Sequence, residues 1–157
     1  MSVRRLNHAV LWVRDATRSA AFYTENLGFT VKLSSMDGRA VFLRAAGSTN
    51  DHDLGLFSKG PGAPAPSSAS TGLYHLAWQV DTIEELARLR AVLAQVGSLV
   101  GESDHGVSKS LYAKDPDGIE FEIMWAVPPE AWPTDGGGIE PLRLDAELAR
   151  WAGVVTA

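Results

Sequence analysis

The residues of this sequence whose types could do chemistry are its four histidines and a glutamate in an alternating apolar run. His8 in "NHAVLWV" and His75 in "YHLAWQV" each precede a run typical of a strand, and Glu122 lies in another such run, "IEFEIMW". Side chains alternate across a strand, so each of the three can project from the face opposite the bulky apolar residues. Two imidazoles and one carboxylate that converge are a set that holds Fe(II) or Mn(II) with open positions. The sequence therefore offers a candidate metal centre.

The alternative for each histidine is structural, because a buried histidine on a strand is more often a hydrogen-bonded core residue than a ligand. The similar positions of the two histidines in the two repeats favour metal binding over a structural role. His8 lies seven residues before Asp15 and His75 lies six before Asp81, and each aspartate introduces a predicted helix. Glu120 shares the strand face of the candidate ligand Glu122 and is its natural comparison.

The elements that must position these residues occur twice. "LNHAVLWVRDATRSAAFYTENLGF" predicts a strand over 4–13, an N-cap at Asp15, and a helix closed by Gly28. "LYHLAWQVDTIEELARLRAVLAQVG" repeats this order, with Asp81 as N-cap and Glu84 completing a capping box. Each helix is followed by three short runs with strand character, at 29–36, 39–46 and 51–58 and at 98–104, 108–114 and 119–127.

The pattern is thus βαβββ twice, which predicts an α+β fold of two modules. Their curved mixed sheets would pair as an eight-stranded open barrel with the helices outside and a cleft between the sheets. We expect a single domain over 1–127, with modules 1–59 and 72–127 joined by the Pro/Gly/Ser-rich linker 60–71. Residues 128–157 would form a C-terminal arm with a short amphipathic helix over 144–151.

Composition excludes several classes of protein. The chain has 157 residues, 45% hydrophobic and 21% charged, which is typical of a globular protein able to bury a core. It has no cysteine, which excludes disulfides and thiolate chemistry and suits a reducing cytoplasm. A net charge of -5 and the lack of any long apolar run argue against nucleic-acid and membrane partners. We expect a soluble, cytoplasmic protein.

Two further stretches, "RSAAFYTENLGF" and "DPDGIEFE", resemble the vicinal oxygen chelate superfamily over essentially the whole chain. This superfamily contains glyoxalase I, bleomycin-resistance proteins, fosfomycin-modifying thiol transferases and type I extradiol dioxygenases. The resemblance implies the fold described above and places the family's metal ligands on His8, His75 and Glu122.

Within the superfamily the sequence is most similar to small catechol-2,3-dioxygenase-like members. The resemblance places an acid-base histidine on His52 in "NDHDLGLF" and a second histidine near the substrate on His105 in "DHGVS". It also places a tyrosine that hydrogen-bonds the substrate on Tyr112, ten residues before the glutamate. The implied function is extradiol cleavage of a catechol-type aromatic diol by O2, an oxidoreductase reaction of aromatic catabolism. Fe(II), or else Mn(II) or another divalent metal, would be the cofactor, and a homodimer the assembly.

Three other functions are open within this family. A glyoxalase-like lyase needs a fourth ligand on the fourth strand, where the expected alternation places Leu54 and Leu56. A fosfomycin-type thiol transferase needs a basic pocket, for which Lys114 and Arg44 are the few inward candidates.

The third alternative is a metal-free drug-binding resistance protein, whose cleft is lined by aromatic residues. Trp12, Trp78 and Trp125 could line such a cleft, but we expect these side chains to pack in the core against the helices.

Overall fold

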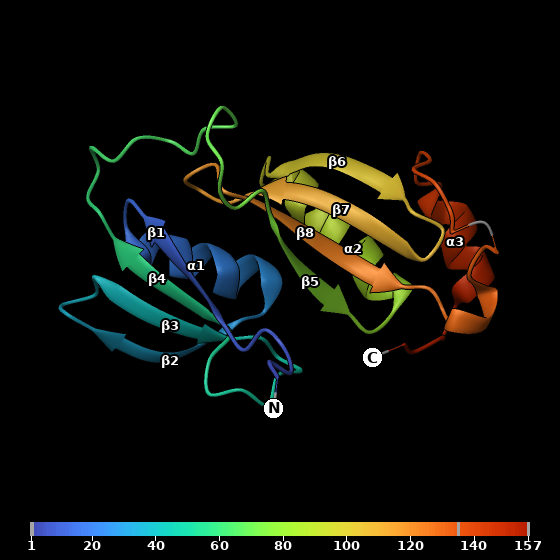
Figure 1. Ribbon diagram of the computed structural model, residues 1–157, viewed down its shortest axis with the longest axis horizontal. Helices are drawn as coiled ribbons and strands as arrows, with labels where there is room; N and C mark the ends of the chain where they lie inside the picture. Colours follow the sequence, from blue (N-terminus) through green and yellow to red (C-terminus); the bar gives the residue numbers. More distant parts are fainter. Residues whose placement is uncertain (1, 135, 157) are drawn as a thin grey trace. The chain divides into compact units, whose positions relative to one another are not determined.

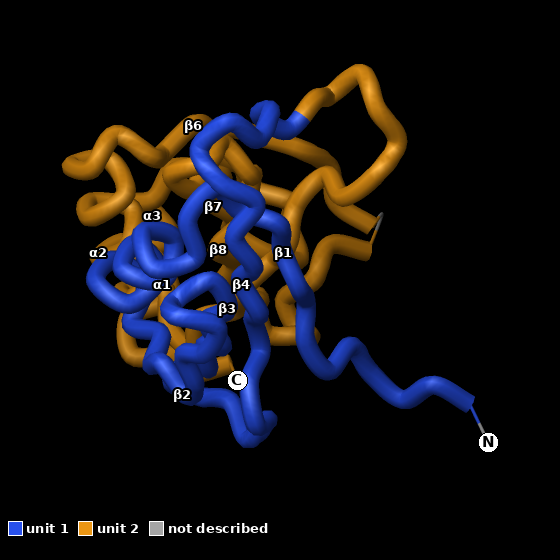
Figure 2. Tube along the Cα trace, turned by 90° about the vertical axis from the view of Figure 1, so that its left-hand side faces the viewer, with its two compact units in different colours: residues 1–66 blue, residues 67–157 orange. Residues whose placement is uncertain are grey.

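The computed structural model describes residues 2–134 and 136–156, which divide into two compact units, residues 1–66 and 67–157 (Figure 2). Unit 1 contains β1 (Ala9–Val13), α1 (Ala16–Leu27), β2 (Thr30–Ser35), β3 (Ala40–Arg44) and β4 (Leu54–Ser58). Unit 2 contains β5 (Leu76–Val80), α2 (Ile83–Gln95), β6 (Leu99–Asp104), β7 (Ser108–Lys114), β8 (Glu120–Ala126), the 3-10 turn η1 (Pro129–Ala131) and α3 (Leu144–Trp151) (Figure 1). The prediction of a single domain over 1–127 stays a prediction.

Each unit is built on a four-stranded mixed sheet, in the order β1-β4-β3-β2 in unit 1 and β5-β8-β7-β6 in unit 2. The first two strands of each order are parallel and the remaining pairs are antiparallel. One helix, α1 or α2, packs on one face of each sheet (Figure 1). The predicted α+β fold class, two βαβββ modules, is confirmed.

The two sheets share their residue-by-residue register. Val10 pairs with Gly55 in unit 1, and Ala77 pairs with Glu122 in unit 2, each two residues after a predicted histidine ligand. Phe42 lies across from Gly55, just as Tyr112 lies across from Glu122. Both β2 and β6 carry a bulge at the corresponding place, between Val31 and Leu33 and between Leu99 and Gly101. Residues at equivalent positions can therefore be compared directly.

The core of each unit lies between its helix and its sheet. In unit 2 the buried face of α2 presents Leu86 and Leu93 to the sheet, whose facing side carries the buried Phe121, Ile123 and Trp125 of β8. Burying each such side chain contributes roughly 1.5–3 kcal/mol to the free energy of unfolding. Because the odd-numbered residues of β8 occupy the core, the even-numbered Glu120 and Glu122 are directed to the opposite face.

Several predicted boundaries shift. β1 begins at Ala9 and not at residue 4, because only β4 flanks it and β4 itself begins at Leu54. The N-cap of α2 is Thr82 and not Asp81: the Thr82 hydroxyl accepts from the Glu85 amide at 3.2 Å.

Other predicted boundaries are confirmed. Asp15 caps α1 by accepting from the Arg18 amide at 3.0 Å, and Gly28 ends α1 in the left-handed conformation with φ 73°. The helix predicted over 144–151 has those bounds, and Trp151 packs 5.6 Å from the ring of Trp125. None of the helices in the described part of the chain has the length and apolar character needed to cross a membrane.

Candidate active site

Unit 2 brings together two of the three predicted metal ligands. His75 Nε2 lies 3.2 Å from Glu122 Oε2, and the side chains are only 24% and 13% exposed. The parallel register of β5 and β8 causes this meeting, because it aligns the start of β5 with the middle of β8. Two donor atoms bound side by side at about 2.1 Å from one metal ion lie about 3 Å apart. The spacing of this pair therefore fits two ligands of a single divalent metal.

Beside this pair lies a chain of three hydrogen-bonding side chains. Tyr112 is directly across from Glu122 on β7, and its ring centroid is 5.6 Å from that of His75. The Tyr112 hydroxyl lies 2.9 Å from His105 Nε2, which is also 2.8 Å from Ser103 Oγ. The predicted residues Tyr112 and His105 are thus in direct contact, next to the carboxylate. Ser103 was missed by the sequence reasoning.

Unit 1 brings together the other two histidines. The ring centroids of His8 and His52 lie 4.6 Å apart. His8 Nδ1 lies 2.9 Å from Asn7 Oδ1, and His52 Nδ1 lies 2.9 Å from Asp51 Oδ2. Both oxygens act as acceptors, so each Nδ1 carries a hydrogen, and in the neutral imidazole Nε2 is then the atom with the lone pair. That tautomer suits a metal ligand, whose other ring nitrogen donates to a supporting acceptor, and equally suits a base.

A hydrogen-bonded loop before β4 holds His52 in place. The buried Asp53 carboxylate accepts from Ser48 Oγ at 2.7 Å, from the Ala45 amide at 2.9 Å and from Asn50 Nδ2 at 2.8 Å. Burial alone would raise the pKa of Asp53, but these hydrogen bonds outweigh it and lower that pKa. Asn50 Nδ2 also donates to the Asn7 carbonyl at 2.8 Å. The loop and the segment that precedes β1 are therefore tied together.

Aromatic rings continue along this face of unit 1. The distance between ring centroids is 5.0 Å from His52 to Phe42, 5.7 Å from Phe42 to Phe57, and 5.9 Å from Phe57 to Trp12. Trp12 is 61% exposed, so the expectation that it packs in the core is wrong. Its strand alternates, and the inward positions of β1 belong to Leu11 and Val13. Trp125, by contrast, is fully buried as expected.

The register of β4 also corrects the expected position of a fourth metal ligand on that strand. Leu54 and Leu56 are fully buried on the helix side of β4, so they do not occupy the place of a fourth ligand. Gly55 does, because its position in unit 1 corresponds to that of Glu122 in unit 2. A four-ligand glyoxalase set remains incomplete, for want of a carboxylate at Gly55.

The C-terminal arm packs against the loop that carries His105. Asp104 and Glu140 exchange two backbone hydrogen bonds of 2.8 Å. A Cβ added at Gly137 would lie 2.6 Å from the His105 carbonyl oxygen. The buried Lys109 ammonium joins Asp104 at 2.5 Å and Glu147 of α3 at 3.4 Å. The arm and α3 therefore contact the segment that carries His105 on both sides of this residue.

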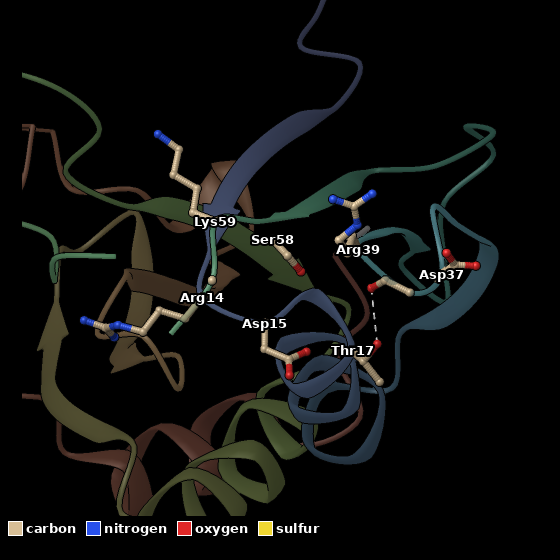
Figure 3. Close-up of a pocket in the computed structure, with 9 residues that line it drawn as sticks. Arg14, Asp15, Thr17, Asp37, Arg39, Ser58 and Lys59 are labelled. Carbon is tan, nitrogen blue, oxygen red and sulfur yellow. Dashed lines mark hydrogen bonds between the residues drawn. The ribbon is translucent and has the colours of Figure 1, made fainter. Parts of the chain in front are cut away.

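Two pockets in the described part of unit 1 can be compared with the predicted site residues. One, of 440 Å³, borders His52 and is lined by Lys32, Leu33, Phe42, Asp51 and His52. The other, of 470 Å³, lies at the start of α1 and is lined by Arg14, Asp15, Thr17, Asp37, Gly38, Arg39, Ser58, Lys59 and Gly60 (Figure 3). Two backbone amides at that helix start already have acceptors, since Ala16 donates to Ser58 Oγ and Arg18 to Asp15. The Thr17 hydroxyl in turn donates to the Gly38 carbonyl (Figure 3). The second pocket lies past the end of β1, away from His8.

The predicted ligands are divided between the units, with His8 in unit 1 and His75 and Glu122 in unit 2. Within neither unit do three described histidine, aspartate or glutamate side chains gather into a set that could hold a metal ion. The structure thus places two of the three predicted ligands, His75 and Glu122, together and the third, His8, beside His52.

The family model described as the Glyoxalase/Bleomycin resistance protein/Dioxygenase superfamily matches residues 5–123. The chain belongs to this superfamily. Members of the glyoxalase/dioxygenase superfamily are often enzymes and usually bind a divalent metal. The matched range ends within β8, so the arm and α3 lie beyond the family model.

Among curated proteins, a catechol-2,3-dioxygenase of Bacillus subtilis (strain 168) is 35% identical over 134 residues, or 85% of the chain. The chain spans only 45% of that protein's length. Among solved structures, a glyoxalase/dioxygenase from Nostoc punctiforme is 24% identical with a TM-score of 0.65, covering 80% of this chain and 92% of that one. A fosfomycin resistance protein from Listeria monocytogenes is 20% identical with a TM-score of 0.62, covering 83% and 99%. These two structures support the superfamily fold.

Proposed function

We propose that this superfamily member is a metal-dependent extradiol dioxygenase that opens the ring of a catechol-type aromatic diol with O2. The observation that carries the proposal is the contact of His75 with Glu122, with Tyr112 directly across from that carboxylate. The 35% identity to a protein named catechol-2,3-dioxygenase favours this reaction over the others in the superfamily.

His75 and Glu122 would hold the metal, with His8 as the proposed third ligand. The free Nε2 of His8, fixed by the hydrogen bond to Asn7, suits that role. Fe(II), the metal we favour over Mn(II) and other divalent ions, would supply a site for both catechol oxygens and electron transfer to O2.

His52 is the proposed acid-base residue. Its Nδ1 hydrogen is donated to Asp51, so Nε2 can take a proton from a catechol hydroxyl and return it when the ring opens. The Asp51 carboxylate stabilises the imidazolium that forms between the two transfers. Both atoms of O2 enter the product, so the reaction consumes no further reductant.

Tyr112 is the proposed substrate-binding residue. Its single hydroxyl hydrogen can be donated to a deprotonated catechol oxygen when His105 Nε2–H donates to the hydroxyl oxygen. His105 and Ser103 would then set the orientation of the phenol. The product expected is a ring opened beside the diol, of the muconic semialdehyde type.

The test is anaerobic reconstitution with Fe(II), followed by mono-, bi- and polycyclic catechols and O2. A yellow ring-fission chromophore is expected with at least one catechol, together with uptake of one O2 per ring opened. Absence of turnover across the whole panel would overturn the proposal. Glyoxalase and thiol-transferase assays on the same preparation would then identify the reaction class.

A further inference from the structure

The 440 Å³ pocket beside His52 has two apolar walls and a charged rim. Leu33 pairs with Phe42 across β2 and β3, and Phe42 pairs with Gly55, so these side chains share the face of the sheet that bears His52. Leu33 is 55% exposed, although it is a large apolar side chain. Such a surface beside a proposed catalytic residue is suited to the apolar part of a ligand.

Lys32 stands at the rim because of the bulge in β2. It is the extra residue between Val31 and Leu33, and the bulge turns it toward the pocket that it lines. Val100 holds the equivalent bulge position in β6 of unit 2. The same backbone feature is therefore built with an apolar residue in one unit, so the fold does not require a cation at this place.

Asp51 is the only carboxylate among the residues that line this pocket, and it is already engaged. It accepts from His52 Nδ1 at 2.9 Å, and this hydrogen bond is the largest cause of its lowered pKa. Lys32 and Arg44 both add to that lowering, so both cations lie near the carboxylate. Lys32 is the one of these two cations that lines the pocket, so it is the one placed to meet an anionic group of a ligand there.

We propose that this pocket binds a carboxylate-bearing side arm of the aromatic diol, with the arm's carbons against Leu33 and Phe42 and its carboxylate at Lys32. The inference rests on the proposed function, because it takes His52 as the residue beside the reacting ring. The substrate class is accordingly an acidic catechol.

The experiment measures anaerobic binding to the metal-loaded protein by calorimetry, with three probes of similar shape. These are dihydroxyphenylacetate, its methyl ester and dopamine, which carry a negative, a neutral and a positive arm. Lys32→Met removes the charge and keeps the stem, and Lys32→Glu reverses the charge. Lys59→Met is the matched control, because Lys59 lines the separate pocket of Figure 3 and lies over the ring of Trp12.

The wild-type protein is expected to bind the acid more tightly than the ester, and Lys32→Met to weaken the acid alone, by about threefold to tenfold. Added salt should reduce the preference of the wild-type protein. Lys32→Glu should favour dopamine over the acid, and Lys59→Met should leave all three affinities within about twofold.

Equal binding of acid and ester, an unchanged affinity for the acid in Lys32→Met, or no binding of any probe would overturn the inference. Turnover is measured separately with O2. An acid that binds through Lys32 but is not cleaved would count against the proposed reaction and would support the anionic pocket, so the two failures are distinguishable.

Discussion

Gly55 occupies in unit 1 the register position that Glu122 occupies in unit 2. The duplicated fold therefore supplies a carboxylate at only one of two equivalent places. The same comparison sets Phe42 against Tyr112 and Trp12 against Gln79. Unit 1 carries the apolar rings of Phe42 and Trp12 where unit 2 carries the polar groups of Tyr112 and Gln79, so the two equivalent sheet faces differ in polarity.

Removal of the Glu122 charge should abolish metal binding. Glu122→Gln is expected to weaken binding of Fe(II) or Mn(II) by at least about a hundredfold, since even indirect supporting partners of a metal ligand are worth tenfold to a hundredfold. Calorimetric titration of the metal-free variant provides the measurement. Glu120→Gln is the control, because Glu120 lies two residues away on the same face of β8 and pairs with Lys114. Equal weakening in both variants would contradict the assignment.

The two histidines of unit 1 should separate by phenotype. His52→Ala is expected to keep bound Fe(II) and to lower kcat by about a hundredfold to ten-thousandfold, because it removes the proton carrier. His8→Ala is expected to lose the metal. Metal content and turnover, measured on the same samples, decide the matter, and equal metal loss in both variants would make His52 a ligand.

The effect of the close approach of Gly137 to His105 can be measured separately from the effect of the left-handed backbone conformation of Gly137. Gly136→Ala and Gly137→Ala both force alanine into the left-handed region, with φ 85° and 74°, at a cost of about 1–2 kcal/mol each. Only at Gly137 would the new Cβ collide with the His105 carbonyl, whereas nothing lies within 4 Å at Gly136. Gly137→Ala should therefore cost a further ~1–3 kcal/mol of unfolding free energy in urea.

Amide exchange gives a local measure of the same contact. Faster exchange in the loop that carries His105 is expected in Gly137→Ala and not in Gly136→Ala. If the two variants are equally stable and exchange alike, the arm does not position His105.

Asp115 in the turn before β8 predicts a pH dependence of stability. Its side chain is 5% exposed, and burial raises its pKa although Oδ1 accepts from the Asp117 and Ile119 amides. The pKa of Asp115 is higher in the folded state than in the unfolded state. Its contribution to the free energy of unfolding is therefore complete below the unfolded pKa of about 3.9 and is lost as the pH rises through the raised folded pKa.

The comparison variant is Asp115→Asn, which keeps an oxygen for the two amides and cannot ionise. The stability of the wild-type protein relative to this variant should fall with rising pH, by at most about 1.4 kcal/mol per pH unit within that window. Urea unfolding of both proteins from pH 3 to 7 provides the measurement. A difference that stays constant, or grows with pH, would contradict the burial argument.

Local patterns in the sequence determined the repeated βαβββ order and the polar face of β8. Asp15, Gly28 and the helix over 144–151 were predicted because caps and apolar periodicity act within a few residues of the chain. Alternation within β8 sufficed to place Glu122 on the face opposite the core. Such features require no knowledge of distant segments.

Only the tertiary structure decided which side chains meet. The pairing of β4 with β1 and β3 put Gly55, and not Leu54, on the site face, because the loop that carries His52 leaves the strand alternation before β4 begins. That departure is held by hydrogen bonds to residues distant in sequence, because Asn50 Nδ2 donates to the Asn7 carbonyl and the Ala9 amide donates to the Asp53 carbonyl. The exposure of Trp12 and the contact of His105 with Tyr112 have the same origin, since register and loop course depend on non-local hydrogen bonds.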